Sequence, residues 1–120
     1  MTQQRRQFPR YAIELDAVIV TSEEEVPGRT HDLSRGGFCM MAPKAIAVGE
    51  VVRVRLSLVF SENQFSEHLE LPATVVWCTP MRATQQLGIK FGPIDPTNRG
   101  YLDVFIKLLD DSAGEEDGET

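Results

Sequence analysis

Two short polar clusters in this sequence carry side chains suited to binding an anion or a nucleotide base. The first is the run Arg5-Arg6-Gln7-Phe8-Pro9-Arg10, which holds three arginines and no acid. Guanidinium groups bind phosphate through paired hydrogen bonds, pair with the O6 and N7 edge of guanine, and stack on base faces. Pro9 favours an extended Phe8, so the run is expected to form a stiffened basic arm. Taken alone, the run is better interpreted as a solvated basic terminus.

The second cluster is Asp32-Leu33-Ser34-Arg35-Gly36-Gly37. Asp32 and Ser34 favour turns because their side chains hydrogen-bond to nearby backbone, and successive glycines permit positive φ and a close approach of a ligand. Exposed backbone amides beside a serine hydroxyl and Arg35 suit an anion or a base edge. An ordinary tight connection between two strands remains the alternative.

The elements that must position these clusters are short β-type runs separated by turn residues. Apolar and alternating runs predict strands at residues 12–21, 29–33, 38–42, 51–60, 68–79 and 86–91. Pro27-Gly28 indicates a turn, residues 61–67 a hairpin connection, and Pro72 an edge or a bulge. From Thr97 to Leu109 the apolar spacing becomes helical, with Thr97 or Asn98 as the cap. The pattern predicts a mainly β fold, a six-stranded antiparallel barrel with a C-terminal α-helix.

The domain organisation follows from length and charge. Residues 1–109 are expected to form one domain, with residues 1–11 as a flexible arginine-rich arm. Six of the 18 acids follow Leu109 with no base among them, so residues 110–120 are expected to be an acidic disordered tail. No apolar stretch approaches the roughly 20 residues of a membrane span, and the first residues lack the apolar core of a signal peptide. A cytoplasmic location without membrane insertion is the expectation.

Other chemistries find little support in the sequence. Cys39 and Cys78 lie in apolar runs, without metal-ligand spacing to the two histidines, and are expected to be free thiols. No nucleophile–base pair or catalytic carboxylate pair is evident, so an enzyme, a cofactor and a metal are not expected. Aromatics are not interleaved with the basic residues, which disfavours a nucleic-acid polymer as partner. Trp77, in an apolar strand, is interpreted as core, with a stacking platform as the alternative.

The two clusters together resemble the PilZ domain family. The resemblance rests on Arg6-x-x-x-Arg10 followed by Asp32-x-Ser34-x-x-Gly37, and spans roughly residues 5–109. Other stretches agree with it: Val48-Gly49-Glu50-Val51, Ala73-Thr74-Val75-Val76-Trp77 and Leu87-Gly88-Ile89-Lys90-Phe91. The resemblance implies a barrel of the split-barrel type that binds cyclic di-GMP.

The resemblance also implies roles for individual residues. Arg6 and Arg10 would clamp guanine and phosphate, Asp32 and Ser34 would contact guanine or phosphate, and Gly36 and Gly37 would form the turn against the ligand. Arg5 lies outside the strict motif and could reach a phosphate or a second, intercalated ligand molecule.

The implied function is that of a cyclic di-GMP receptor or effector controlling motility or surface behaviour. Binding would order the arm and change the conformation or the contacts with an unidentified downstream protein, which could belong to the motility machinery. The alternative is a ligand-independent protein-interaction adaptor of a pilus or flagellar system.

Overall fold

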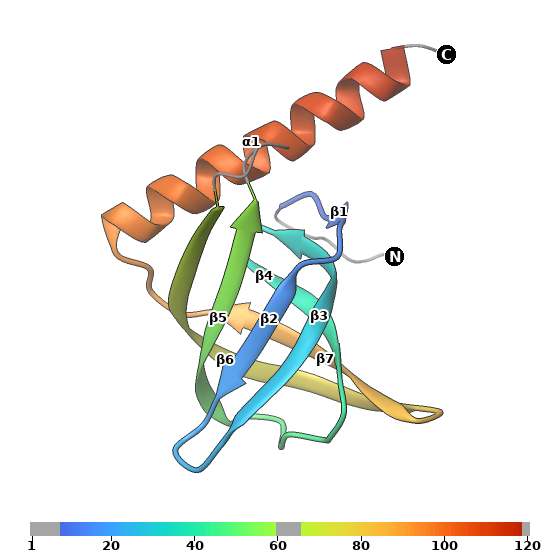
Figure 1. The fold of residues 1–120 in the computed structure, drawn as a ribbon, viewed down its shortest axis with the longest axis vertical. Coiled ribbons are helices and arrows are strands. Elements are labelled where there is room, and N and C mark those ends of the chain that lie inside the picture. The colour runs from blue at the N-terminus through green and yellow to red at the C-terminus, as the bar shows by residue number, and fades with distance from the viewer. Residues whose placement is uncertain (1–7, 60–65, 119–120) are drawn as a thin grey trace, which may run out of the picture.

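A computed structural model describes residues 8–59 and 66–118, and shows an antiparallel β-barrel with a helix across one end (Figure 1). Its elements are β1 (Tyr11–Ala12), β2 (Asp16–Val20), β3 (Glu25–Ser34), β4 (Gly37–Ala42), β5 (Val51–Val59), β6 (Ser66–Met81), β7 (Thr84–Phe91) and α1 (Pro96–Gly118). The strands follow the order β1-β3-β2-β5-β6-β7-β4, and a further β3–β4 pairing closes the sheet. Strands β2 to β7 therefore form the predicted six-stranded barrel, while β1 adds a two-residue pairing to β3.

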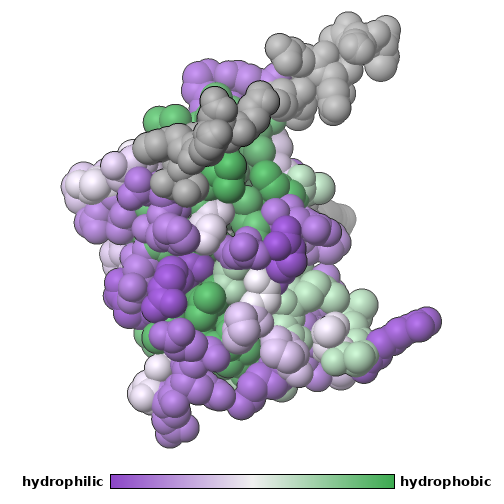
Figure 2. All heavy atoms as spheres, viewed as in Figure 1, coloured by the Kyte–Doolittle hydropathy of each residue, from purple (hydrophilic) through white to green (hydrophobic). Residues whose placement is uncertain are grey.

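The core fills the barrel and the space beneath α1. Strand β5 shows the reason, because its even-numbered residues from Val52 to Leu58 are buried while Arg53 between them is exposed. Leu102, Phe105 and Ile106 of α1 are also buried. Figure 2 shows hydrophobic atoms reaching the surface where α1 meets the barrel. No helix within residues 8–59 and 66–118 has the length and apolar character to cross a membrane.

The helix differs from its prediction at both ends. It starts at Pro96, and Asp95 accepts a hydrogen bond from the Asn98 backbone N–H at 2.8 Å, so Asp95 is the cap rather than Thr97 or Asn98. It continues to Gly118, beyond the predicted end at Leu109, and the expectation of an acidic disordered tail over residues 110–120 stays a prediction. The i,i+4 pair of Lys107 with Asp111, 3.7 Å apart, extends the helix across that boundary.

Two strand predictions were also inaccurate. Residues 12–21 do not form one strand, because the chain leaves β1 after Ala12 and re-enters the sheet at Asp16. Pro27-Gly28 is not a turn but lies inside β3, opposite Val18 and Ala17. A Cβ at Gly28 would collide with the Met41 carbonyl, so the glycine is required by the close crossing of β3 and β4.

Proline placement explains how the ladders tolerate missing N–H donors. Pro27 pairs with β2, whereas the ladder from β3 to β4 begins only at Arg29. Pro72 pairs with β5 at the point where β7 has ended at Phe91, and its carbonyl accepts a bond of 2.8 Å from Gly92. Each proline thus lies where its strand has a ladder on one side only, which is where strands accept proline. The bulge of β6 lies further along, between Val75 and Trp77.

Candidate ligand-binding site

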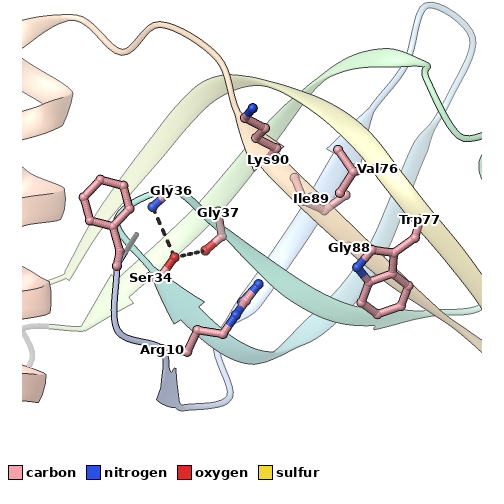
Figure 3. A pocket seen from close by; sticks show the side chains of 10 residues that line it. Arg10, Ser34, Gly36, Gly37, Val76, Trp77, Gly88, Ile89 and Lys90 are labelled. Carbon is pink, nitrogen blue, oxygen red and sulfur yellow. Dashed lines mark hydrogen bonds between the residues drawn. The ribbon is translucent and has the colours of Figure 1, made fainter. Parts of the chain in front are cut away.

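A hollow of about 190 Å³ opens on the outer face of the barrel, beside the turn between β3 and β4. Figure 3 shows the Arg10 side chain directed toward the hollow, with the Ser34 turn and Trp77 also at its edge. The residues that line it are Phe8, Arg10, Ser34, Gly36, Gly37, Val76, Trp77, Gly88, Ile89 and Lys90. They come from the arm and from four strands, so the hollow exists only in the closed barrel.

An ion pair holds Arg10 against the barrel. The Arg10 Nη1 donates to Asp32 Oδ1 at 2.8 Å, and the same oxygen accepts the backbone N–H of Cys39 at 3.2 Å. The pairing of Tyr11 with Leu33 and of Ala12 with Asp32 explains this position, because it starts directly after Arg10. Both side chains of the pair are partly buried, which shields their attraction from solvent.

Two β-bulges turn the site's side chains outward. Residues three apart on a regular strand point to opposite faces, yet Thr30 and Leu33 are both buried. The register shift between Thr30 and Asp32 accounts for this, because one extra residue of β3 lies in the bulge. A second shift lies between Val75, which is buried, and Trp77, which is 39% exposed. Residues two apart on a regular strand share a face, so the bulge places Trp77 on the opposite face from Val75.

The turn after β3 is held by its serine. Ser34 is buried; its Oγ accepts the Gly36 N–H at 3.1 Å and donates to the Gly37 carbonyl at 3.3 Å. Gly36 and Gly37 do not use the positive φ that glycine permits, since among the described residues only Gly49 and Arg82 adopt it. Gly37 is required for packing instead, because a Cβ there would collide with the Ile89 carbonyl of β7.

Trp77 was interpreted as a core residue, and this was wrong. Its indole lies over Gly88 of β7, the residue paired with it, where a Cβ would collide with the ring. Lys90, two residues after Gly88 in β7, is exposed. It lines the same hollow, which therefore has two cations, Arg10 and Lys90. An aromatic surface, two cations and a serine turn thus border one space. That combination suits a ligand with planar bases and negative charge.

Two residues near the site, Arg35 and Tyr11, make polar contacts with α1. Arg35 does not line the hollow; its Nε lies 3.3 Å from Asp103 Oδ1 of α1. The Tyr11 hydroxyl donates to Asp110 Oδ1 at 2.7 Å, and this hydrogen bond raises the pKa of Tyr11 above its ordinary 10.0. Tyr11, which follows Arg10, and Arg35 of the turn are therefore both in contact with the helix.

A larger hollow of about 450 Å³ lies elsewhere, between His31 and Ala83. Its arginine, Arg29, is held by Asp16 at 2.6 Å and lies 3.8 Å from Glu14, so carboxylates neutralise the cation. This second hollow is therefore poorly suited to an anion.

The cysteines are free, as predicted. Burial, followed by the nearby charge of Asp32, raises the pKa of Cys39 above its ordinary 9.0, so this thiol is protonated at neutral pH. Within the described part of the chain, no cluster of three or more histidine, cysteine or acidic side chains could hold a metal ion.

The structure brings most of the predicted site residues together. Arg10, Ser34, Gly36 and Gly37 line one hollow, and Asp32 joins it through Arg10. Arg5 and Arg6 lie outside the described residues. Sequence reasoning missed Trp77, Gly88 and Lys90 as parts of this hollow; the available signal was the Trp-Gly cross-strand pair, which needs the register to be known.

Comparison with known proteins identifies the family. Residues 4–108 match the PilZ domain family. Among solved structures, the Bacillus subtilis inhibitor of motility MotI/DgrA superposes with a TM-score of 0.78 at 20% identity, over 94% of this chain and 53% of that protein. The PilZ domain of Escherichia coli YcgR, solved with c-di-GMP, gives 0.70 at 17% identity, over 98% of this chain and all of that domain. The K. pneumonia MrkH–c-di-GMP complex gives 0.70 at 15% identity, over 98% of this chain and 57% of that protein.

The chain belongs to the PilZ domain family. It spans about half the length of MotI/DgrA and of MrkH, and the low identities mean that these structures establish the fold. No curated protein matches the chain.

Proposed function

We propose that this PilZ domain is a receptor for cyclic di-GMP and not an enzyme. The ligand would lie in the hollow with a guanine on Trp77 and its phosphates toward Arg10, Lys90 and the Ser34–Gly37 turn. The observation that carries the proposal is the convergence of Arg10, the serine turn and an exposed tryptophan on one space. Two neighbours, YcgR and MrkH, were solved with c-di-GMP bound.

Each group offers a distinct interaction. Arg10 already holds one carboxylate oxygen of Asp32, so a phosphate or a guanine edge can take its remaining N–H donors. Asp32 has a second carboxylate oxygen that can accept from the N1 and N2 donors of guanine. Trp77 offers the exposed part of its ring for stacking.

The arm would complete the site. The hollow holds about 190 Å³, below the roughly 300–1,000 Å³ of small-molecule sites. We propose that Arg6, with Arg5 beside it, closes over the ligand, so that binding orders the arm. The number of ligand molecules bound would then depend on whether Arg5 engages a second one.

The downstream role follows as a proposal of the same kind. One structural neighbour is named as an inhibitor of motility. We propose that the ligand-bound form of this protein acts on a downstream protein that controls motility or surface behaviour. We propose that it does so in the cytoplasm. The hydrogen bonds from Tyr11 and Arg35 to α1 would couple ligand binding to the surface of the helix.

Calorimetric titration of cyclic di-GMP into the protein tests the proposal. Saturable binding is expected, with much weaker binding of cyclic di-AMP, whose adenines lack the O6 acceptor and the N1 and N2 donors of guanine. Arg6→Ala should weaken binding roughly 10- to 150-fold, the loss of one charge-assisted contact. Absence of heat with cyclic di-GMP would overturn the receptor and favour the ligand-independent adaptor.

A further inference from the structure

Arg35 belongs to the turn that borders the hollow, but its side chain is held by α1. Its neighbours in the sequence, Ser34 and Gly36, both line the hollow, whereas Arg35 does not. The Arg35 Nε instead donates to Asp103 Oδ1 of α1 at 3.3 Å. A guanidinium group suited to phosphate therefore lies beside the proposed ligand space and is paired with a carboxylate of the helix.

The backbone of the turn is fixed by hydrogen bonds that do not involve the Arg35 side chain. The Arg35 carbonyl accepts a hydrogen bond from Arg99 Nη1 at 3.4 Å, and the Gly36 carbonyl accepts one from the Phe91 N–H at 2.9 Å. Ser34 Oγ accepts the Gly36 N–H at 3.1 Å. The side chain of Arg35 can thus change its partner while the turn keeps its position.

The ion pair of Arg35 with Asp103 is suited to such an exchange. The two side chains are 39% and 42% exposed, so solvent screens their attraction and the pair is weak. Arg99 Nη1 lies 3.5 Å from the same oxygen, Asp103 Oδ1. This carboxylate therefore keeps a cation beside it when Arg35 leaves.

Open space lies beside the Arg35 side chain and beside the turn. Arg35 borders a hollow of about 230 Å³ between Pro9 and Ile106, separate from the one that Ser34 lines. The hollow lined by Ser34 holds about 190 Å³, below the roughly 300–1,000 Å³ of small-molecule sites. A cyclic dinucleotide must therefore extend past the rim of that hollow, and the turn that contains Arg35 is part of the rim.

We propose that Arg35 is a further ligand-binding residue, which α1 holds through Asp103 until cyclic di-GMP binds. The inference rests on the proposed receptor function. Both phosphates of the ligand are negatively charged, and a phosphate at the rim takes the Arg35 guanidinium from Asp103, which keeps Arg99. Binding includes the cost of separating Arg35 from Asp103, so this contact with α1 lowers the affinity for the ligand.

A double-mutant cycle on the full chain tests the inference, with the affinity for cyclic di-GMP measured by calorimetry. Asp103→Asn removes the carboxylate that competes for Arg35 and should tighten binding roughly two- to fivefold. Arg35→Ala should weaken binding roughly 3- to 30-fold, less than the loss of a full charge-assisted contact, because the wild type must first separate the pair. In the Arg35→Ala background, Asp103→Asn should change the affinity by less than about 1.5-fold.

Two control variants separate the exchange from other effects of charge. Asp16→Asn makes the same charge change and removes the partner of Arg29, which lies outside the hollow, so the affinity should stay unchanged. Arg35→Lys keeps the positive charge without the paired N–H donors and should recover part of the affinity that Arg35→Ala loses. Thermal unfolding without ligand shows whether each variant is folded before titration.

A wild type that does not bind cyclic di-GMP overturns the receptor function, and the role of Arg35 with it. If the wild type binds and Asp103→Asn binds no more tightly, α1 does not hold Arg35 back and the inference is wrong. An Arg35→Ala variant that binds as tightly as the wild type would show that Arg35 does not contact the ligand. Tightening by Asp103→Asn that persists without Arg35 would assign the effect to the lost charge alone, which also contradicts the inference.

Discussion

Trp77 offers the sharpest test of how the base is held, because the proposed stacking depends on ring chemistry and not on size alone. The indole covers Gly88 on one side and is 39% exposed, so one base can stack on it. Stacking of a base on an aromatic side chain is worth about 1–3 kcal/mol by truncation, and 1.4 kcal/mol corresponds to tenfold. Trp77→Leu should therefore weaken binding roughly 5- to 150-fold.

Trp77→Phe is the matched variant, because it keeps a flat aromatic ring over Gly88 and should lose only a few-fold in affinity. Calorimetry gives both affinities, and thermal unfolding without ligand shows whether each variant is folded before titration. If the leucine variant bound as tightly as the wild type, or the phenylalanine variant as weakly as the leucine one, stacking on Trp77 would be refuted.

Three further predictions concern charge, packing and pH. Arg10→Ala should weaken cyclic di-GMP binding roughly 10- to 150-fold by calorimetry, whereas Arg29→Ala, whose arginine is paired with Asp16 outside the hollow, should not. Gly37→Ala should destabilise the fold by about 1–3 kcal/mol or more in denaturant unfolding, because its Cβ meets the Ile89 carbonyl; Gly100→Ala, with open space around it in α1, should stabilise by roughly 0.5–1 kcal/mol. Because the pKa of Tyr11 is raised, the hydrogen bond of Tyr11 stabilises the fold fully below pH 10.0, and this stabilisation is lost as the pH rises through the higher pKa of the folded state. Asp110→Asn should lower the pKa of Tyr11 in a tyrosinate absorbance titration. An unchanged titration would contradict the hydrogen bond as the cause of the raised pKa.

The barrel could be predicted because its strands obey a simple period. Strand β5 alternates buried residues with exposed or half-buried ones from Val51 to Val59, and the sequence carries that alternation directly. The helix was equally visible, since Leu102, Phe105 and Ile106 fall on one face. Its far end was misjudged because the acidic composition after Leu109 favours solvation, whereas the backbone continues as helix to Gly118.

The parts of the candidate site that are local in the sequence could be predicted, and the parts that depend on strand pairing could not. The arginine run and the Asp32–Gly37 turn are local patterns, and the turn and Arg10 do meet at the hollow. Trp77 was misassigned because a bulge after Val75 reverses the phase of β6, and no local signal marks a bulge whose partner strand is unknown. Lys90 and Gly88 enter the site only through the pairing of β7 with β4 and β6, which is a property of the closed barrel.

Trp77 is the only tryptophan of the chain and lies at the edge of the hollow, so its fluorescence reports directly on that space. We expect cyclic di-GMP to change the emission in a saturable manner, and cyclic di-AMP at the same concentrations to change it little. Arg6→Ala and Arg10→Ala should shift the midpoint to higher ligand concentration, while Arg29→Ala should leave it in place. Emission that stays constant through a titration in which calorimetry detects binding would place the ligand elsewhere, and absence of both signals would contradict the receptor function.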